Sequence, residues 1–207
     1  MKQKFPGSAL LAPVPAVLIS CGDTQVKNAL TAAWVGMVCT APPMLSVSIR
    51  PERYSYPIIE KSGEFAVNLS TRNLVRATDY CGVRSGRDVD KAALCGFTYQ
   101  DGAEIKAPII AECPVNLECK VREIQHLGSH DLILADIVCV QVDDKLIDAN
   151  GRIALEKADL ITYCHGQYFA LGELLGSFGY SVKRPKKGGT KRFENSKKSH
   201  PERKKKI

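Results

Sequence analysis

Arginine and hydroxyl side chains gather between residues 50 and 57, just before an apolar run. Arg50 and Arg53 are followed by Ser55, Tyr56 and Pro57, and the residues after them favour a helix. Ser55 or Tyr56 would cap this helix, and Pro57 would lie in its first turn, where a missing N–H is harmless. A helix start flanked by Arg and hydroxyl groups binds phosphate well. The pattern therefore predicts a phosphate site, whereas either arginine by itself would more often be a surface ion-pair residue.

A small polar segment, Asn28-Ala-Leu-Thr31-Ala-Ala33, lies upstream of this site. Its alanine-rich backbone would let a flat ring approach closely, because few side-chain atoms stand in the way. Together with the phosphate site, the segment predicts a phosphorylated aromatic ligand. These residues alone do not identify that ligand.

Strands must hold the two segments in place. Residues 34–39 and 45–49 are rich in apolar residues and are separated by Pro42-Pro43, which predicts two strands. Further strands are expected at 16–21, 64–70, 115–127, 132–143, 160–164 and 168–171, with a helix ending near residue 63 and two helical pieces within 72–95, the first stopped by Gly82. This series favours a mainly β fold, a closed or nearly closed antiparallel barrel with short helices outside it. The chain has no glycine-rich dinucleotide fingerprint and no P-loop.

The positive charge of the chain is concentrated at its end. Residues 183–207 contain twelve Lys and Arg against two Glu, so they carry +10, and the remaining residues carry −3 of the total of +7. We therefore expect one domain over residues 1–182 and a basic, disordered tail over 183–207. A nucleic-acid-binding barrel would interleave Arg and aromatic residues on its strands. The body lacks that pattern, so we expect no more than weak, salt-sensitive attraction of the tail to polyanions.

Eight cysteines are spread along the chain without any Cys-x-x-Cys pair. Most lie in apolar runs, which favours reduced core thiols in a cytoplasmic protein over disulfides or a metal site. No apolar run approaches the length of a membrane span. Pro13 and Pro15 interrupt the apolar N-terminal stretch, so a first strand is expected there rather than a signal peptide.

Six motifs follow one another along the body: Asn28-Ala-Leu-Thr31-Ala-Ala33-Trp34, Ser46-Val-Ser48-Ile49-Arg50-Pro51, Arg53-Tyr-Ser-Tyr56, Phe65-Ala-Val-Asn68-Leu69, Gly128-Ser129-His130 and Tyr163…Tyr168-Phe169. In this order they resemble the flavin reductase-like family with the FMN-binding split-barrel fold, a Greek-key-like antiparallel barrel, and most closely its flavoredoxin branch. The resemblance extends over about residues 8–175. The basic tail has no counterpart in it.

The resemblance implies FMN held across the interface of a homodimer. Thr31, Ala32, Ala33 and Trp34 would contact the isoalloxazine ring, with Asn28 in the same segment. Ser48, Ile49 and Arg50 would line the path of the ribityl chain and phosphate, and Arg53, Ser55 and Tyr56 would lie near the phosphate. Part of this assignment has independent support, because a phosphate favours Arg forks, hydroxyls and backbone N–H groups.

Several residues keep an alternative interpretation. Trp34 could belong to the core as well as contact the ligand, and Asn68 could bind FMN or merely satisfy buried backbone groups. Tyr168 is a strand aromatic first and a neighbour of the flavin ring second. His130 is assigned next to the nicotinamide or the flavin, although Ser129 replaces an acidic partner found in the family's motif. His126 is a histidine of the same type without that assignment.

The sequence therefore predicts an FMN-binding oxidoreductase that moves electrons from NAD(P)H, or from a redox protein, to an acceptor. That acceptor could be a flavin, a ferric complex or a partner protein. The alternative is a non-enzymatic FMN-containing electron carrier that depends on a partner reductase. No metal and no membrane partner are expected.

Overall fold

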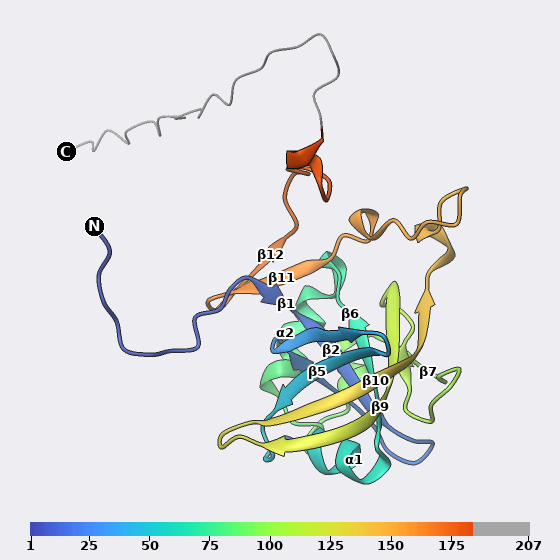
Figure 1. Ribbon diagram of the computed structural model, residues 1–207. Coiled ribbons are helices and arrows are strands. Elements are labelled where there is room, and N and C mark those ends of the chain that lie inside the picture. The colour runs from blue at the N-terminus through green and yellow to red at the C-terminus, as the bar shows by residue number, and fades with distance from the viewer. Residues whose placement is uncertain (184–207) are drawn as a thin grey trace, which may run out of the picture. The chain divides into compact units, whose positions relative to one another are not determined.

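The computed structural model describes residues 1–183 (Figure 1). The chain divides into two compact units, Met1–Leu171 and Gly172–Ile207. The last strand ends at Ala170, and the change of charge at which the tail is expected to begin comes after residue 182. Within the second unit the described residues form one short 3-10 helix, η4 (Tyr180–Val182). The predicted disorder of the tail concerns residues 184–207, which lie outside the described residues.

The first unit is built on a seven-stranded antiparallel sheet with the strand order β3-β2-β6-β9-β10-β5-β4. Its strands are β2 (Val17–Gly22), β3 (Lys27–Ala32), β4 (Val35–Thr40), β5 (Pro43–Ile49), β6 (Glu64–Leu69), β9 (Val115–His126) and β10 (Asp131–Val142). This architecture confirms the predicted mainly β, antiparallel fold. The strand β3 was not predicted, because its small and polar residues have low strand propensity; its pairing with β2 imposes the strand.

Alternation along the strands builds the main core. Leu45, Val47 and Ile49 of β5 are fully buried, whereas Ser46 and Ser48 lie on the outer face. Phe65 of β6 and Ile133 of β10 pack into the same cluster. The sheet thus encloses one apolar core, and the segments just after β3 and β5 emerge next to each other at its edge.

The helix α1 (Ser55–Ser62) follows β5 after a tight turn. It begins earlier than expected: Tyr54 already has helical backbone angles and is the N-cap, without a side-chain capping bond. The prediction that Ser55 or Tyr56 would be the cap is therefore wrong. The helix ends as predicted at Gly63, whose φ of 67° lies in the left-handed region that glycine adopts easily.

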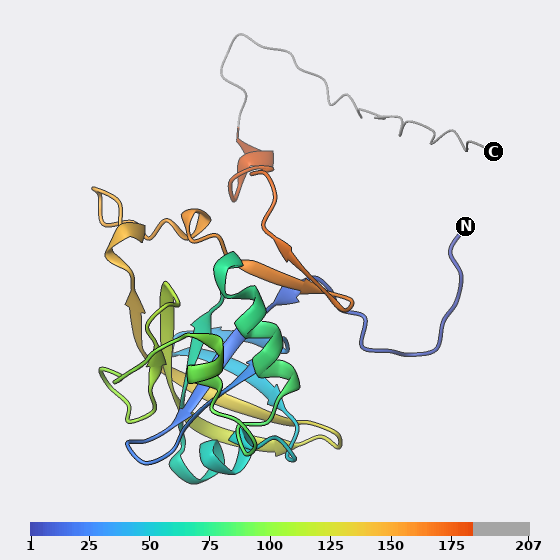
Figure 2. The same cartoon turned by 180° about the vertical axis from the view of Figure 1, so that it is seen from behind.

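Two further helices pack beside β2 and β3, as Figure 2 shows from behind. They are α2 (Val75–Val83), preceded by the 3-10 turn η1 (Arg72–Leu74), and α3 (Lys91–Cys95). The helix α2 runs one residue past Gly82, where a stop was expected. Its Ala77 and Cys81 form a second apolar cluster with Leu18 and Phe97.

A separate small sheet has the order β1-β11-β12, from β1 (Val14–Pro15), β11 (Ile161–Cys164) and β12 (Gln167–Ala170). The turn of the β11–β12 hairpin is His165-Gly166, and both residues have positive φ, 47° and 88°. The remaining elements are short: β7 (Tyr99–Gln100), β8 (Ile109–Ile110), η2 (Asp144–Leu146) and η3 (Leu155–Lys157).

All eight cysteines are free thiols. Burial raises the pKa of the Cys21 thiol to about 11 and that of Cys113 to about 12, so both are protonated and behave as small apolar groups. Within residues 1–183, no helix combines the length and apolar character needed to cross a membrane.

Candidate functional site

A cavity of about 470 Å³ opens where β3, β5, α2 and the β11–β12 hairpin meet. This volume lies in the range of small-molecule sites. Ten of the predicted site residues line it: Thr31, Ala32, Ala33, Trp34, Ser48, Ile49, Arg50, Arg53, His130 and Tyr168. The fold therefore brings together segments that are more than a hundred residues apart in the chain.

The end of β3 forms one wall of this cavity, which we call the larger cavity. The helix α2 packs directly against β3. The Thr31 hydroxyl donates a hydrogen bond to the carbonyl oxygen of Thr78 on α2. A Cβ atom at Gly82 would lie 3.3 Å from Cβ of Thr31, so the glycine allows this close approach. The wall of the cavity is consequently mostly backbone and methyl groups, which suits the face of a flat ring.

Trp34 and His130 form an aromatic pair at the mouth of the cavity. Their ring centroids are 4.5 Å apart and the rings are tilted by 43°. Burial, with Arg50 nearby, lowers the pKa of His130 below its ordinary value, and Oγ of Ser129 lies 3.0 Å from its Nδ1. The imidazole is thus neutral near pH 7, and Ser129 supplies the hydrogen-bonding partner that the missing acidic residue would have provided.

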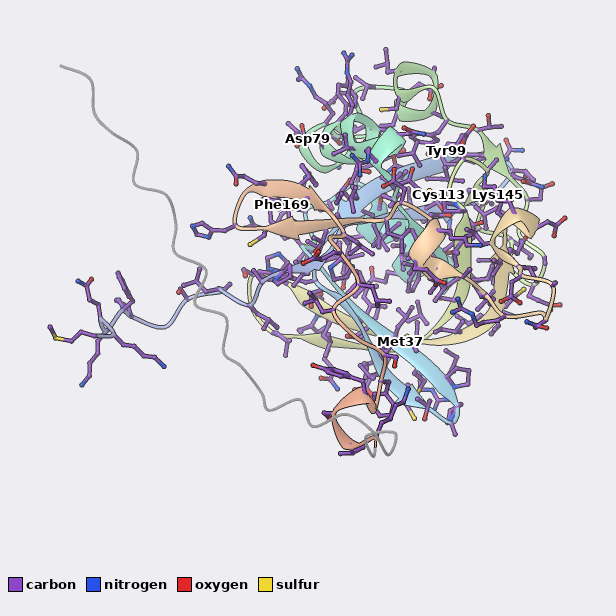
Figure 3. The ribbon with its side chains drawn as sticks, turned by 90° about the horizontal axis from the view of Figure 1, so that it is seen from above. Met37, Asp79, Tyr99, Cys113, Lys145 and Phe169 are labelled. Carbon is purple, nitrogen blue, oxygen red and sulfur yellow. The ribbon has the colours of Figure 1, made fainter. Side chains whose placement is uncertain are left out.

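The β11–β12 hairpin contributes two tyrosines on another side. The rings of Tyr163 and Tyr168 meet edge to face at 5.4 Å, and the Tyr168 hydroxyl donates to Oδ1 of Asp79 at 3.3 Å. Burial and the Asp79 carboxylate raise the pKa of Tyr168 to about 12. Figure 3 shows Asp79, on α2, beside the hairpin that carries Phe169. The hairpin and α2 are therefore tied together over the cavity.

A smaller cavity of about 110 Å³ adjoins the larger one, and Leu30, Arg53 and Val83 line both. Its other lining residues include Ser55, Ser85 and Lys91. The Lys91 ammonium is buried and donates to the carbonyl oxygens of Ala29 at 2.6 Å and Cys81 at 3.0 Å. Burial lowers the pKa of Lys91. This cavity combines cationic and hydroxyl groups, which is the donor set that a phosphate needs.

The side chains of the smaller cavity are held by short contacts. Asn28 donates from Nδ2 to Oγ of Ser55 at 2.6 Å, which leaves the serine proton available to another acceptor. A Cβ atom at Gly86 would lie only 2.0 Å from Oδ1 of Asn28, so the loop after α2 can approach Asn28 only because residue 86 is glycine. Arg53 donates to the carbonyl oxygen of Gly82 at 3.0 Å and so links the turn before α1 to α2.

Two predicted site residues lie elsewhere. Tyr56 points into the core and donates its hydroxyl to Oδ2 of Asp131 at 2.6 Å, and His126 contacts the same oxygen at 2.8 Å. Neither Tyr56 nor Asn68 lines either cavity. Tyr56 therefore lies outside the cavity that combines cationic and hydroxyl groups.

Asn68 is a fully buried centre of polar contacts between strands. Its amide donates to the carbonyl oxygen of Leu18 and to Oγ of Ser20, and its Oδ1 accepts from the backbone of Ile110 and from Asn116. These bonds explain its polar character in apolar company, so the alternative interpretation of Asn68, as a residue that satisfies buried groups, fits its position.

Sequence reasoning missed Asp79, Ser85, Gly86 and Lys91. The pattern of residues 72–95 predicts only two helical pieces with a break between them. Nothing in the neighbouring sequence indicates that a charged residue there is buried. The Arg84-Ser85-Gly86-Arg87 run between two helices was the one available signal. Among the described residues, no group of three or more His, Cys, Asp or Glu side chains is placed to hold a metal ion.

Comparisons with known proteins identify relatives of this chain. An uncharacterized protein of Archaeoglobus fulgidus is 33% identical over 143 residues, which cover 69% of this chain and 80% of that protein. The structure of flavoredoxin of Desulfovibrio vulgaris (Miyazaki F) matches with a TM-score of 0.81 and 30% identity, covering 88% of this chain and 100% of that one. The FMN reductase (NADH) RutF of Agrobacterium fabrum is 25% identical over 139 residues, covering 65% of this chain and 77% of that protein.

Residues 10–172 match the model of the flavin reductase like domain, which is most of the chain. Both the extent of this match and the order of the motifs around the two cavities lead to one assignment. The chain belongs to the flavin reductase-like family and has its split-barrel fold.

Proposed function

We propose that this protein binds FMN and passes electrons from NAD(P)H through it to an acceptor. The observation that carries the proposal is the pair of adjoining cavities that Arg53 joins. One is lined by backbone, methyl groups and aromatic rings, and the other by cationic and hydroxyl groups. A phosphorylated flavin has the same two parts, a flat ring and a dianionic phosphate.

The residues of the smaller cavity would hold the phosphate. Arg53 supplies a planar fork of donors, the Lys91 ammonium has one N–H beyond the two that its carbonyl partners use, and Ser55 and Ser85 supply hydroxyls. One phosphate site and no dinucleotide fingerprint favour FMN over FAD. The end of β3 would support the ring, and backbone N–H groups in the Thr31–Trp34 segment would supply donors to it.

When bound, FMN would supply the capacity to accept a hydride equivalent and to release its electrons to an acceptor. The chain would contribute positioning rather than proton transfer. Neutral His130, held against Trp34, would present a flat surface where a nicotinamide enters, and the Tyr163–Tyr168 pair would exclude water from the opposite side. Holding two rings in contact distance is the main requirement of hydride transfer between them.

A second candidate function is an FMN-containing electron carrier that depends on a partner reductase. The similarity to flavoredoxin favours it, whereas the similarity to an FMN reductase (NADH) favours the enzyme. Anaerobic mixing of the purified yellow protein with NADH or NADPH separates the two, with the visible flavin absorption as the readout. Rapid bleaching supports the reductase. Slow or absent bleaching, with reduction by a redox protein, supports the carrier.

We also propose that the protein is a homodimer with two equivalent FMN sites. Large apolar side chains remain exposed on the strands that flank β5, namely Met37 and Val38 on β4 and Val138 and Val140 on β10. A twofold interface would bury such a surface. If FMN contacts both subunits, it must also stabilise the dimer. Light scattering over a range of protein concentrations, with and without FMN, tests this; a monomer that retains FMN tightly throughout would contradict it.

The free thiols favour a reducing compartment, so we propose a cytoplasmic location. Fractionation of cells that express the native chain tests this directly.

A further inference from the structure

A further cavity of about 420 Å³ lies next to the proposed flavin site. Ala33, Trp34 and Ser48 line both this cavity and the larger one. A molecule in the further cavity would therefore lie against residues that also line the flavin site. We call it the outer pocket, because it lies on the outer face of β4 and β5.

The sequence produces this pocket through small residues at paired positions. Gly36 of β4 is the register partner of Ser46 of β5, and Ser48 lies two residues further on the same face. Because none of these three positions carries a large side chain, a hollow remains beside Trp34. Leu11, from the segment before β1, and Val14 form an apolar wall.

The lining of the outer pocket contains no charged residue. Its polar side chains are Ser46 and Ser48, and within residues 1–183 neither hydroxyl is engaged in a side-chain hydrogen bond, so both are available as donors. Leu11 is 87% exposed and Trp34 is 47% exposed, so apolar surface here remains open to solvent. Such a pocket disfavours anions, which would lose their hydration without gaining a counter-charge.

We propose that the outer pocket binds a neutral quinone as the electron acceptor of the proposed FMN site. A quinone is flat and apolar, and its carbonyl oxygens can accept hydrogen bonds from the two serines. Free FMN and ferric carboxylate complexes carry charges that the pocket does not match. The inference rests on the proposed function for the source of electrons, and the quinone binding step itself rests only on this chain's residues.

The net reaction is NAD(P)H + H⁺ + quinone → NAD(P)⁺ + hydroquinone. The C4–H bond of the nicotinamide breaks, and its two electrons reduce the quinone. Two O–H bonds form on the quinone oxygens. One proton derives from the nicotinamide hydrogen or its exchange with solvent, and the other is taken from solvent.

Gly36→Leu is the variant that tests the pocket. A Cβ atom at Gly36 would meet nothing within 4 Å, and its φ is not in the left-handed region, so a side chain there would extend into open space without straining the strand. Gly36 does not line the flavin cavity. Gly36→Ala fills less of the space and serves as a graded variant. Val26→Leu changes an exposed valine in the turn between β2 and β3 that lines neither the outer pocket nor the two cavities of the proposed flavin site, and it is the control.

The measurement is titration calorimetry of the oxidised, FMN-loaded protein with duroquinone and no reductant. Duroquinone has no free ring position, so it does not add to the cysteine thiols. We expect saturable binding by the native chain and by Val26→Leu, weaker binding by Gly36→Ala, and at least tenfold weaker binding by Gly36→Leu. FMN affinity should be the same in all four proteins.

Two outcomes would overturn the inference: no duroquinone binding by the native chain, or equal binding by a folded Gly36→Leu variant. If a second copy covers the outer pocket, the native dimer will not bind duroquinone, which counts against the inference. Bleaching by NADH or NADPH is measured separately. Its failure would remove the proposed reductase while leaving Gly36-dependent quinone binding as an independent result.

Discussion

Arg53 is the residue on which the proposed phosphate site depends most. It lines both cavities, and its guanidinium also donates to the carbonyl oxygen of Gly82 at 3.0 Å. Arg53→Ala would remove a charge-assisted hydrogen bond to phosphate, worth about 1.5–3 kcal/mol. Since each 1.4 kcal/mol is a factor of ten in affinity, FMN should bind roughly 10- to 150-fold more weakly. Arg53→Lys keeps the charge without the planar fork, so its loss should be smaller.

A comparison of FMN with riboflavin identifies the group that Arg53 contacts. Riboflavin has the same ring and ribityl chain but no phosphate. The dissociation constants follow from the quenching of flavin fluorescence on binding to each protein. Arg53→Ala should weaken FMN strongly and leave riboflavin little changed, because only FMN carries the anion.

Arg122→Ala is the matched control for this experiment. Arg122 pairs with Asp136 on neighbouring strands, with Nη2 and Oδ1 2.8 Å apart, and it lines neither cavity. Its removal should change neither dissociation constant. If Arg53→Ala weakens both ligands equally, the effect comes from the lost contact with Gly82 and a displaced α2. Unchanged FMN affinity would refute the phosphate assignment altogether.

Three further predictions concern stability and the tail. Tyr56→Phe should lower the thermal midpoint and move acid unfolding to higher pH, as circular dichroism can show. The Tyr56 hydroxyl holds the pKa of Asp131 below its ordinary value. Its contribution to stability is therefore present above the unfolded pKa of about 3.9 and is lost as the pH falls through the folded pKa. Glu118→Gln should lower the free energy of unfolding by about 1–3 kcal/mol, measured with urea at pH 7. Burial by itself raises the pKa of this carboxyl, but hydrogen bonds from backbone N–H groups of the loop before β8 lower it below its ordinary value. A glutamine amide would place a donor against those N–H groups. The difference between Glu118→Gln and the native chain should shrink as the pH falls through the folded pKa of Glu118. Truncation after Val182 should leave folding and FMN affinity nearly intact and weaken retention on heparin at low salt, because the removed residues carry the positive excess.

The long strands could be predicted from sequence because their own residues determine them. Residues 115–127 and 132–143 alternate or run apolar over more than ten positions, and β9 and β10 match these ranges to within one residue at each end. The strand β3 could not be predicted this way. Its burial comes from β2 and α2, which are contributed by other parts of the chain.

The same distinction, between features set by local residues and features set by distant parts of the chain, applies to the candidate site. The contiguous segments around Thr31 and Arg50 could be predicted, because each motif carries several site residues in a row. Tyr56 and Ser55 are separated because neighbouring side chains on a helix point about 100° apart. Ser55 therefore lines the smaller cavity while Tyr56 turns to Asp131 in the core.

Lys91 shows why the rest of such a site is not visible in sequence. An isolated lysine in a short helix is normally solvated, and nothing in its neighbours announces that it is buried. In the structure it is 4% exposed, and within residues 1–183 no carboxylate forms an ion pair with it. Two carbonyl oxygens satisfy part of its donor capacity, but a buried ammonium without a counter-charge still costs free energy. An anionic ligand in the adjoining cavity would offset that cost, so the position of Lys91 is better explained by ligand binding than by stability of the free protein.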